Sequence, residues 1–259
     1  MGRTAADFKR IGYRPGDENR LDLVDDDFLE RATPWATLLE KFFRFELHGI
    51  ENVPAGPAIV VMPHSTISVD GFLVGLHIYR HHGRLVRGLT DHSIFTVPGL
   101  RNAFIRMGVV DGNRDNAVAL LRRGEICLAM PGGAYEAWRP SRDRYRLFWE
   151  GRTGFVRVAL AAQAAILPTV CIGADDALYL PFHALEWGQR ILRRRFPLAP
   201  PLLPVPVKFT AYLGEPITFD EPVESADDEA VVARCHAEVV ARVEEMIESG
   251  LRARRSLWY

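Results

Sequence analysis

Residues 58–70 read AIVVMPHSTISVD, and this stretch decides how the chain is expected to fold. The apolar, β-branched run 58–62 lies between Pro57 and Pro63, which predicts a short buried strand. Ser68 is then placed to cap a helix whose apolar positions recur at helical spacing, namely Phe72, Leu73, Leu76 and Tyr79. A strand that passes into a helix is therefore predicted around His64 and Asp70.

His64 and Asp70 place a base and a carboxylate at this strand-to-helix connection. Asp70 is expected in the first helical turn, where the helix dipole favours an ionised carboxylate. A carboxylate bonded to one imidazole nitrogen fixes the tautomer and leaves the other nitrogen able to accept a proton near neutral pH. The pair is a layout for deprotonating a hydroxyl. The alternative is a loop histidine beside an aspartate at an ordinary first-turn position.

The rest of the chain alternates short apolar runs with helical patterns. Further strands are predicted at 45–49, 85–89, 125–130, 165–172 and 207–213, and helices at 35–43, 97–107, 113–123, 153–163 and 227–248. Such alternation predicts an α/β fold, a single domain with a mixed central β-sheet covered by helices on both faces.

The expected organisation is an N-terminal leader over residues 1–33 and a domain over 34–259. An amphipathic helix with an aromatic face opens the domain at 34–44, and the acidic segment 22–27 before it is expected to be irregular. Residues 179–206 break the pattern and are rich in Trp, Phe, Leu, Pro and Arg. This segment is predicted to be an insertion over the site or on a lipid surface, the alternative being core helix and solvated charge.

Composition bounds the class of protein. The chain has 259 residues, of which 48% are hydrophobic, and its 32 basic and 33 acidic residues nearly cancel, so the balance does not suggest nucleic acid. Three scattered cysteines favour a reducing cytoplasm, and the N-terminus lacks the apolar core of a signal peptide. The apolar stretch 155–172 is broken by Arg157, Gln163 and Pro168, which favours a helix and a strand over a membrane span. A cytoplasmic protein, soluble or peripheral on the inner face of a membrane, is expected.

A glycine pair follows the predicted strand 125–130. Gly132 and Gly133 would let backbone amides approach a ligand at the carboxyl edge of the sheet, although a plain tight turn has the same signature. Glu136, three residues later, is a candidate to bond a substrate hydroxyl or to hold an arginine, and an ordinary solvated glutamate is the alternative.

Two arginines stand at predicted helix starts. Arg152, together with the N-terminus of the helix 153–163, is a candidate to hold an anionic group, and Arg114 has the same position before the helix 113–123. A surface arginine is the alternative for both. The sequence contains no Gly-x-Ser-x-Gly elbow, Walker loop, dinucleotide glycine pattern or metal-ligand cluster, which weakens hydrolase, nucleotidase and metalloenzyme interpretations.

Five blocks occur in a characteristic order: His-x5-Asp, Gly-Asn-Arg-Asp, Pro-Gly-Gly-Ala-Tyr-Glu-Ala, Arg-Thr-Gly-Phe and Ile-Leu-Pro. This order resembles the glycerolipid and lysophospholipid acyltransferase superfamily, and the Pro-Gly-Gly-x-x-Glu-Ala and Arg-x-Gly-Phe blocks look most like its diacylglycerol acyltransferase-like branch. The likeness covers about residues 45–213. It implies that His64 is the catalytic base and Asp70 its partner, and that Gly132, Gly133, Glu136 and Arg152 match substrate-binding blocks.

The resemblance implies an acyltransferase of lipid metabolism, such as phospholipid biosynthesis. It would move a fatty acyl group from acyl-CoA or an acyl carrier protein to a hydroxyl of a glycerolipid or other lipid alcohol, with no further cofactor and no metal. The partners expected are this thioester, the lipid acceptor and a membrane surface reached through segments 35–43 and 182–196. The oligomeric state is left open.

Two departures from the superfamily affect this interpretation. Most members place four residues between His and Asp, whereas this chain has five, so the loop is expected to bulge for the pair to meet. Tyr135 stands where phosphate-accepting members carry arginine, which favours a neutral acceptor such as diacylglycerol. A lipid-binding protein without turnover is an alternative, favoured if His64 and Asp70 lie beyond hydrogen-bond reach; an acyl-thioesterase is another.

Overall fold

A computed structural model describes residues 13–192 and 203–256. Its strands are β1 (Glu46–His48), β2 (Ala58–Val61), β3 (Val86–Thr90), β4 (Val110–Asp111), β5 (Ile126–Ala129), β6 (Ala165–Ile172) and β7 (Thr210–Leu213). In the described part of the chain they form a seven-stranded sheet in the order β1-β7-β6-β2-β5-β3-β4. Every neighbouring pair is parallel except β6 and β7, so the sheet is mixed.

Helices connect these strands. They are α2 (Asp26–Phe42), α3 (Val69–His82), α4 (His92–Phe95), α5 (Pro98–Arg106), α6 (Arg114–Arg122), α7 (Gly133–Ala137), α8 (Gly154–Ala162), α9 (Ala184–Leu192) and α10 (Glu229–Ala253). Short 3₁₀ turns occur at η1 (Asp17–Asn19), η2 (Ile50–Asn52), η3 (Ser141–Asp143), η4 (Ala174–Asp176) and η5 (Val223–Asp227). The predicted α/β class, with helices on both faces of a mixed sheet, is confirmed.

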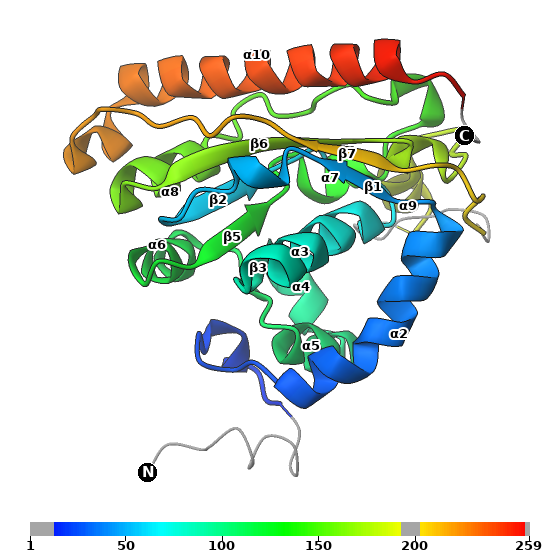
Figure 1. Ribbon diagram of the computed structural model, residues 1–259, viewed down its shortest axis with the longest axis horizontal. Helices are drawn as coiled ribbons and strands as arrows, with labels where there is room; N and C mark the ends of the chain where they lie inside the picture. Colours follow the sequence, from blue (N-terminus) through cyan, green and yellow to red (C-terminus); the bar gives the residue numbers. More distant parts are fainter. Residues whose placement is uncertain (1–12, 193–202, 257–259) are drawn as a thin grey trace.

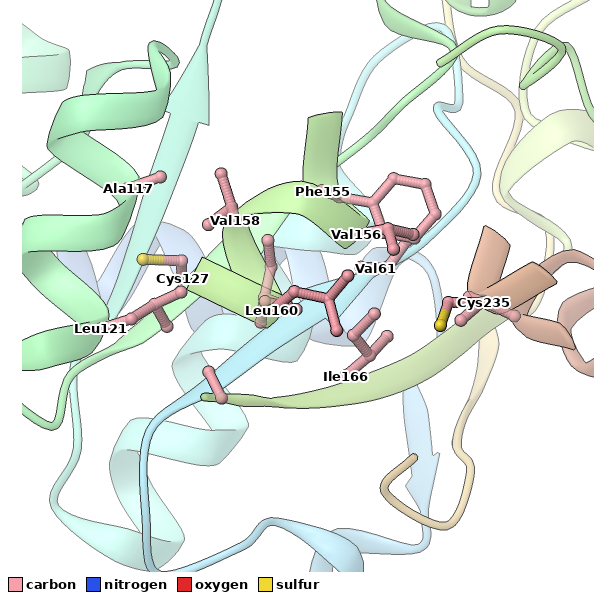
Figure 2. Packing of buried hydrophobic residues seen from close by; sticks show 14 of the residues in the cluster. Val61, Ala117, Leu121, Cys127, Phe155, Val156, Val158, Leu160, Ile166 and Cys235 are labelled. Carbon is pink, nitrogen blue, oxygen red and sulfur yellow. The ribbon is translucent and has the colours of Figure 1, made fainter. Parts of the chain in front are cut away.

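Strand β2 is apolar along its whole length because both of its faces are covered. Ile59 and Val61 point into a cluster formed with α6, α8 and α10, which Figure 2 shows from close by. The alternate residues Val60 and Met62 pack on the other face with α3. Figure 1 shows α10 along one side of the sheet and α3 on the other. A period of two therefore divides one strand between two cores.

Three parallel strands end at the same edge of the sheet. In the register of the sheet, Val61 of β2 lies between Ala129 of β5 and Pro168 of β6. The segment after β2 carries His64, and the segment after β5 carries the two glycines. The sheet topology therefore brings two sequence blocks more than 60 residues apart to one carboxyl edge, where open α/β sheets bind ligands.

Helix α2 begins earlier than the sequence pattern predicted. The expected helix at 34–44 is present, but it starts at Asp26 and continues through Pro34. Asp25 caps it by accepting a hydrogen bond from the Phe28 N–H at 3.1 Å, and two further acidic residues occupy the first turn. The acidic segment 22–27 is irregular over residues 22–25, as predicted, but Asp26 and Asp27 already belong to the helix, because acidic charges favour a helix N-terminus.

The strand predicted at 45–49 and the helix 35–43 meet at Phe43, which is buried. Its ring stacks on Phe209 with centroids 4.1 Å apart, while Trp35 and Leu38 remain 71% and 56% exposed. The aromatic face of the helix is thus divided between the core and the solvent. Before α2, Leu23 is buried against Phe95 and Ile105, so part of the predicted leader packs on the domain.

Candidate active site

The backbone of His64 is held from both sides by one sequence block. The His64 N–H donates to Oε2 of Glu136 at 2.7 Å, and Nη1 of Arg139 donates to the His64 carbonyl oxygen at 3.0 Å. Glu136 lies in α7 and Arg139 follows its end, so both belong to the segment after the glycine pair. Arg139 is itself buried and paired with Asp175. The position of His64 therefore depends on α7 and on the segment after β6.

The His64 ring is oriented by the residue that follows it. Its Nδ1 lies 2.8 Å from the Ser65 carbonyl oxygen and 3.3 Å from Oγ of Ser68. A carbonyl oxygen can only accept, so Nδ1 carries the hydrogen and Nε2 of the neutral ring keeps its lone pair. No hydrogen bond to Nε2 occurs among the described residues. This is the arrangement that a general base requires.

Asp70 does not bond the imidazole, contrary to expectation. Its Oδ1 instead accepts a hydrogen bond from the Ser65 hydroxyl at 2.6 Å, and no ion pair or hydrogen bond joins it to His64 in the described part of the chain. Asp70 does lie in the first turn of α3, as predicted. Ser65 stands between base and carboxylate and is hydrogen-bonded to both.

Ser68 does not cap α3 with its side chain, although it occupies the N-cap position. It adopts a left-handed conformation, with φ at 50°, and makes no side-chain cap hydrogen bond. Its N–H donates to the Ser65 hydroxyl oxygen at 3.1 Å, and its own hydroxyl faces His64. The extra residue of the loop is thus accommodated by a strained backbone turn at Ser68, not by a regular helix start.

Burial shifts the protonation of both groups. Burial lowers the pKa of His64, an effect that the hydrogen bond to the Ser65 carbonyl opposes. A lower pKa keeps the ring neutral at pH 7, and a neutral ring is able to accept a proton. Burial raises the pKa of Asp70 to about 6, with the Ser65 hydroxyl acting against it and the Asp175 charge adding to it. Asp70 is therefore ionised at neutral pH, although it is completely enclosed.

Glu136 has a different role from the one expected. It is 0% exposed, and its carboxylate accepts from the His64 N–H, the Phe148 N–H at 3.1 Å and the Trp149 indole at 3.3 Å. The carboxylate has no surface left for a substrate hydroxyl, and Arg139 donates to the Glu136 carbonyl rather than to the carboxylate. In this structure Glu136 positions the His64 loop.

The two glycines are explained mainly by this packing. A Cβ on Gly132 would lie 2.4 Å from the Glu136 side chain, so only glycine fits there. Gly133 adopts φ 55°, and its N–H donates to the Met130 carbonyl at 3.0 Å. The Gly133 amide is therefore engaged within the turn, while the contact of the Gly132 amide with a substrate stays a prediction.

The predicted arginines lie apart from the His64 cluster in their contacts. Arg114 is exposed and pairs with Asp227 of η5 at 2.7 Å. Arg152 is exposed just before α8, and its side chain makes no hydrogen bond or ion pair within residues 13–192 and 203–256. Arg152 lies three residues after Trp149, whose indole bonds Glu136. Its role in holding an anionic group stays a prediction.

Two residues that matter here, Ser65 and Asp175, were not singled out from the sequence, and Arg139 was a candidate only for binding a phosphate. Ser65, Arg139 and Asp175 connect the loop, α7 and η4 through hydrogen bonds and one ion pair. Ser65, Asp70 and Asp175 also line a small cavity behind the loop, at the end of β6. A serine directly after the histidine and an arginine three residues after Glu136 were the available signals, but neither type of residue is diagnostic alone.

The described residues contain no group of three or more His, Cys, Asp or Glu side chains that could hold a metal ion. Over the same residues, no helix is both long and apolar enough to cross a bilayer.

Comparisons with known proteins indicate the family of the chain. Residues 44–172 match the family model described as Acyltransferase. The chain is 32% identical over 202 residues to the human "DGAT1/2-independent enzyme synthesizing storage lipids", a match that covers 76% of this chain and 60% of the relative. It is 31% identical over 234 residues to an uncharacterized protein of Mycobacterium leprae, covering 85% and 64%. The chain thus spans about six-tenths of the length of these relatives.

The fold has a counterpart among solved structures. The crystal structure of the 1-acyl-sn-glycerophosphate (LPA) acyltransferase PlsC from Thermotoga maritima matches with a TM-score of 0.51 and 16% identity, covering 88% of this chain and 83% of that one. The sheet, its carboxyl-edge histidine and these matches define an acyltransferase fold. By the family match the chain belongs to the Acyltransferase family, and the likeness to PlsC supports its fold.

Replacing Asp70 by Asn is expected to stabilise the protein at neutral pH. The folded pKa of Asp70 is about 6 against an ordinary value of 3.8, so the folded state holds the proton more tightly than the unfolded chain. Stability therefore falls as pH rises between these values, by about 1.4 kcal/mol per pH unit, and is level above them. Asp70→Asn removes this cost while its amide oxygen can still accept from Ser65.

Urea unfolding at pH 4 and pH 7.5 measures this difference. The advantage of Asp70→Asn should be clearly larger at pH 7.5, and Asp220→Asn, which changes an exposed carboxyl, should show little of it. An advantage that is the same at both pH values would contradict the buried charge.

Proposed function

We propose that this chain transfers a fatty acyl group from a thioester, acyl-CoA or an acyl carrier protein, to a hydroxyl of a glycerolipid or other lipid alcohol. The observation that carries the proposal is the His64 ring, whose Nδ1 is bonded to the Ser65 carbonyl while Nε2 has no partner among the described residues. The family and fold support acyl transfer, and the lipid named for the human relative supports a lipid acceptor.

In the proposed reaction, Nε2 of His64 takes the proton of the acceptor hydroxyl as its oxygen attacks the thioester carbonyl carbon. The carbon–sulfur bond of the resulting tetrahedral intermediate then breaks. The leaving thiolate takes the proton from the imidazolium, which restores the neutral ring. The reaction needs no covalent enzyme intermediate, and the Ser65 carbonyl, which accepts from Nδ1, favours the transient positive charge on His64.

One observation favours a second candidate, a lipid-binding protein of the same fold without turnover. His64 and Asp70 are not hydrogen-bonded to each other in the described structure. Against this candidate, the ring still has a single defined tautomer, and Ser65 contacts both residues. The two candidates differ in one measurable property, which is turnover of the thioester.

The His64→Ala variant should lose about 10²–10⁴-fold in transfer rate, because that is the usual contribution of a general base. The assay incubates the purified protein with labelled acyl-CoA and a panel of diacylglycerol, monoacylglycerol and lysophosphatidate. His81→Ala, which removes an exposed ring from the last turn of α3, serves as the matched control and should keep full activity.

Three outcomes would contradict the proposal. A folded His64→Ala protein with near-normal transfer would remove His64 as the base. Wild-type protein that binds the lipids without transferring acyl groups would support the lipid-binding candidate. Release of free fatty acid without an acceptor would instead indicate a thioesterase.

We also propose that the protein works on a membrane surface. Exposed apolar side chains recur at helical spacing on two helices, with Trp35 and Leu38 on α2 and Trp187 and Ile191 on α9. Figure 1 shows α9 and the C-terminal part of α2 on the side of the molecule where β2 and β6 end. Arg190 adds an exposed positive charge to α9, and the run 193–195 lies outside the described residues. Aromatic and cationic side chains together suit an anionic bilayer surface.

Truncation of these side chains should weaken binding to liposomes that contain anionic lipid. The double variants Trp35→Ala/Leu38→Ala and Trp187→Ala/Ile191→Ala are each expected to reduce the partition coefficient by about tenfold or more, because each loses apolar area from the lipid contact. Flotation measures this effect.

The control is Val223→Ala in η5. This exposed side chain follows β7, which runs antiparallel to β6 and so ends at the opposite edge of the sheet. Equal loss of binding in the control, or none in either double variant, would show that these faces do not contact lipid.

The environment of Tyr135 supports a neutral acceptor. Its hydroxyl donates to Oε1 of Glu186 at 2.8 Å, so a negative charge lies where phosphate-accepting relatives carry arginine. Arg139, four residues further along the chain, is buried and engaged with Asp175. A phosphate at this position would meet a carboxylate without a compensating cation from either residue.

Diacylglycerol should therefore compete well against lysophosphatidate at equal concentration. Tyr135→Arg is expected to shift the preference toward lysophosphatidate by about tenfold, the worth of one charge-assisted contact to phosphate. Tyr179→Arg adds the same charge at another exposed tyrosine and should leave the preference unchanged. Strong selection of lysophosphatidate by the wild-type protein would show that another group binds the phosphate.

A further inference from the structure

Ser65, the residue that directly follows His64, is hydrogen-bonded to both His64 and Asp70. Ser65 is only 2% exposed, its hydroxyl bonds Asp70 at 2.6 Å, and its carbonyl accepts from His64 Nδ1 at 2.8 Å. We propose that Ser65 is a positioning residue through which Asp70 orients the catalytic imidazole. This inference rests on the proposed function, in which His64 is the base.

The hydroxyl of Ser65 is fully engaged. Its one hydrogen goes to Asp70, because an ionised carboxylate can only accept, and its oxygen accepts the N–H of Ser68 at 3.1 Å. These two contacts leave the side chain of Ser65 a single orientation. They anchor it to the first turn of α3, the rigid element that carries Asp70.

The peptide groups on both sides of Ser65 are restrained as well. The carbonyl of His64, which precedes Ser65, accepts from Arg139, and Arg139 is held by Asp175. The carbonyl of Ser65 faces the imidazole and lies 3.5 Å from the Ser68 hydroxyl. With the side chain bonded to Asp70 and the preceding carbonyl bonded to Arg139, the Ser65 carbonyl is aimed at Nδ1.

The orientation of the Ser65 carbonyl toward Nδ1 has a chemical consequence for acyl transfer. When His64 takes the acceptor proton, positive charge develops on the ring and the bond from Nδ1–H to the carbonyl strengthens. A carbonyl that already points at Nδ1 needs no rearrangement at that moment. Asp70 thus acts on the base through one serine, and this explains how a motif with five intervening residues keeps the base oriented.

A merely structural serine would fill the same space, so the test must separate the two roles. If Asp70 acts through Ser65, removing both should cost no more than removing one. If each residue stabilises the loop independently, their effects on the rate should multiply. The comparison therefore uses Ser65→Ala, Asp70→Ala, which removes the acceptor of the Ser65 hydroxyl, and the combined variant.

Initial rates with labelled acyl-CoA and diacylglycerol give kcat and KM for each variant. Ser65→Ala should lower kcat by about ten- to a hundredfold, the usual effect of a misaligned catalytic group, with KM changed less than about twofold. The kcat of the combined variant should equal the kcat of the less active single variant. Ser65→Cys, which has a similar shape and a weaker donor, should fall between wild type and Ser65→Ala.

Thr66→Ala is the matched control. It removes a hydroxyl from the next residue of the same loop, and no hydrogen bond of that hydroxyl occurs in the described structure. Its kcat should stay within about twofold of wild type, since it breaks none of the contacts above. Equal loss in Thr66→Ala, wild-type kcat in Ser65→Ala, or multiplying effects in the combined variant would each overturn the proposal.

A second measurement does not depend on activity. Nitrogen-15 NMR of the imidazole rings, with His64 assigned by its absence in His64→Ala, reports which ring nitrogen carries the proton. Wild type should hold it on Nδ1, and Ser65→Ala should move part of the population to Nε2. An unchanged tautomer in Ser65→Ala would overturn the inference. A shift of tautomer in a protein that transfers no acyl group would contradict only the proposed function.

Discussion

The buried carboxylate of Glu136 holds the candidate site together. It accepts hydrogen bonds from the His64 N–H, the Phe148 N–H and the Trp149 indole, and so joins the segment after β2 to the segment after α7. A charge removed from water is costly unless its lone pairs are satisfied, and here three donors satisfy them. Gly132 leaves room for this carboxylate, because any side chain at position 132 would collide with Glu136. The glycine block and the histidine block therefore form one structural unit.

Much of the fold could be predicted because the relevant patterns are local. Strand β6 begins and ends where its apolar run does, and α8 and α10 follow from their helical periodicity. Strand β4 has two residues and α7 has five, too few to show a period. The early start of α2 depends on how Asp25 and its neighbours act as a cap, which an acidic run alone does not distinguish from a solvated segment.

The candidate site was predictable in its location but less in its contacts. The place of His64 follows from the end of a parallel strand, a position set by topology. Which atoms meet there depends on a loop conformation, including the positive φ of Ser68, that no pattern of residue types encodes. The enclosure of the Glu136 carboxylate was not predictable for the same reason, because its donors Phe148 and Trp149 lie 12 and 13 residues away in sequence.

The sheet also constrains the order in which the chain can fold as it is synthesised. Strand β1 pairs with β7, so Glu46 can pair only after Thr210 has been synthesised. The ring of Phe43 is likewise covered only after Phe209 has been synthesised. At a synthesis rate of about 5–20 residues per second, that delay is about ten to thirty seconds. During it the nascent chain exposes an unpaired strand edge and an uncovered aromatic ring, the features that chaperones bind. Because Arg254, just beyond α10, bonds Asp176 next to the Arg139–Asp175 pair, the contacts around this pair are complete only after Arg254 has left the ribosome.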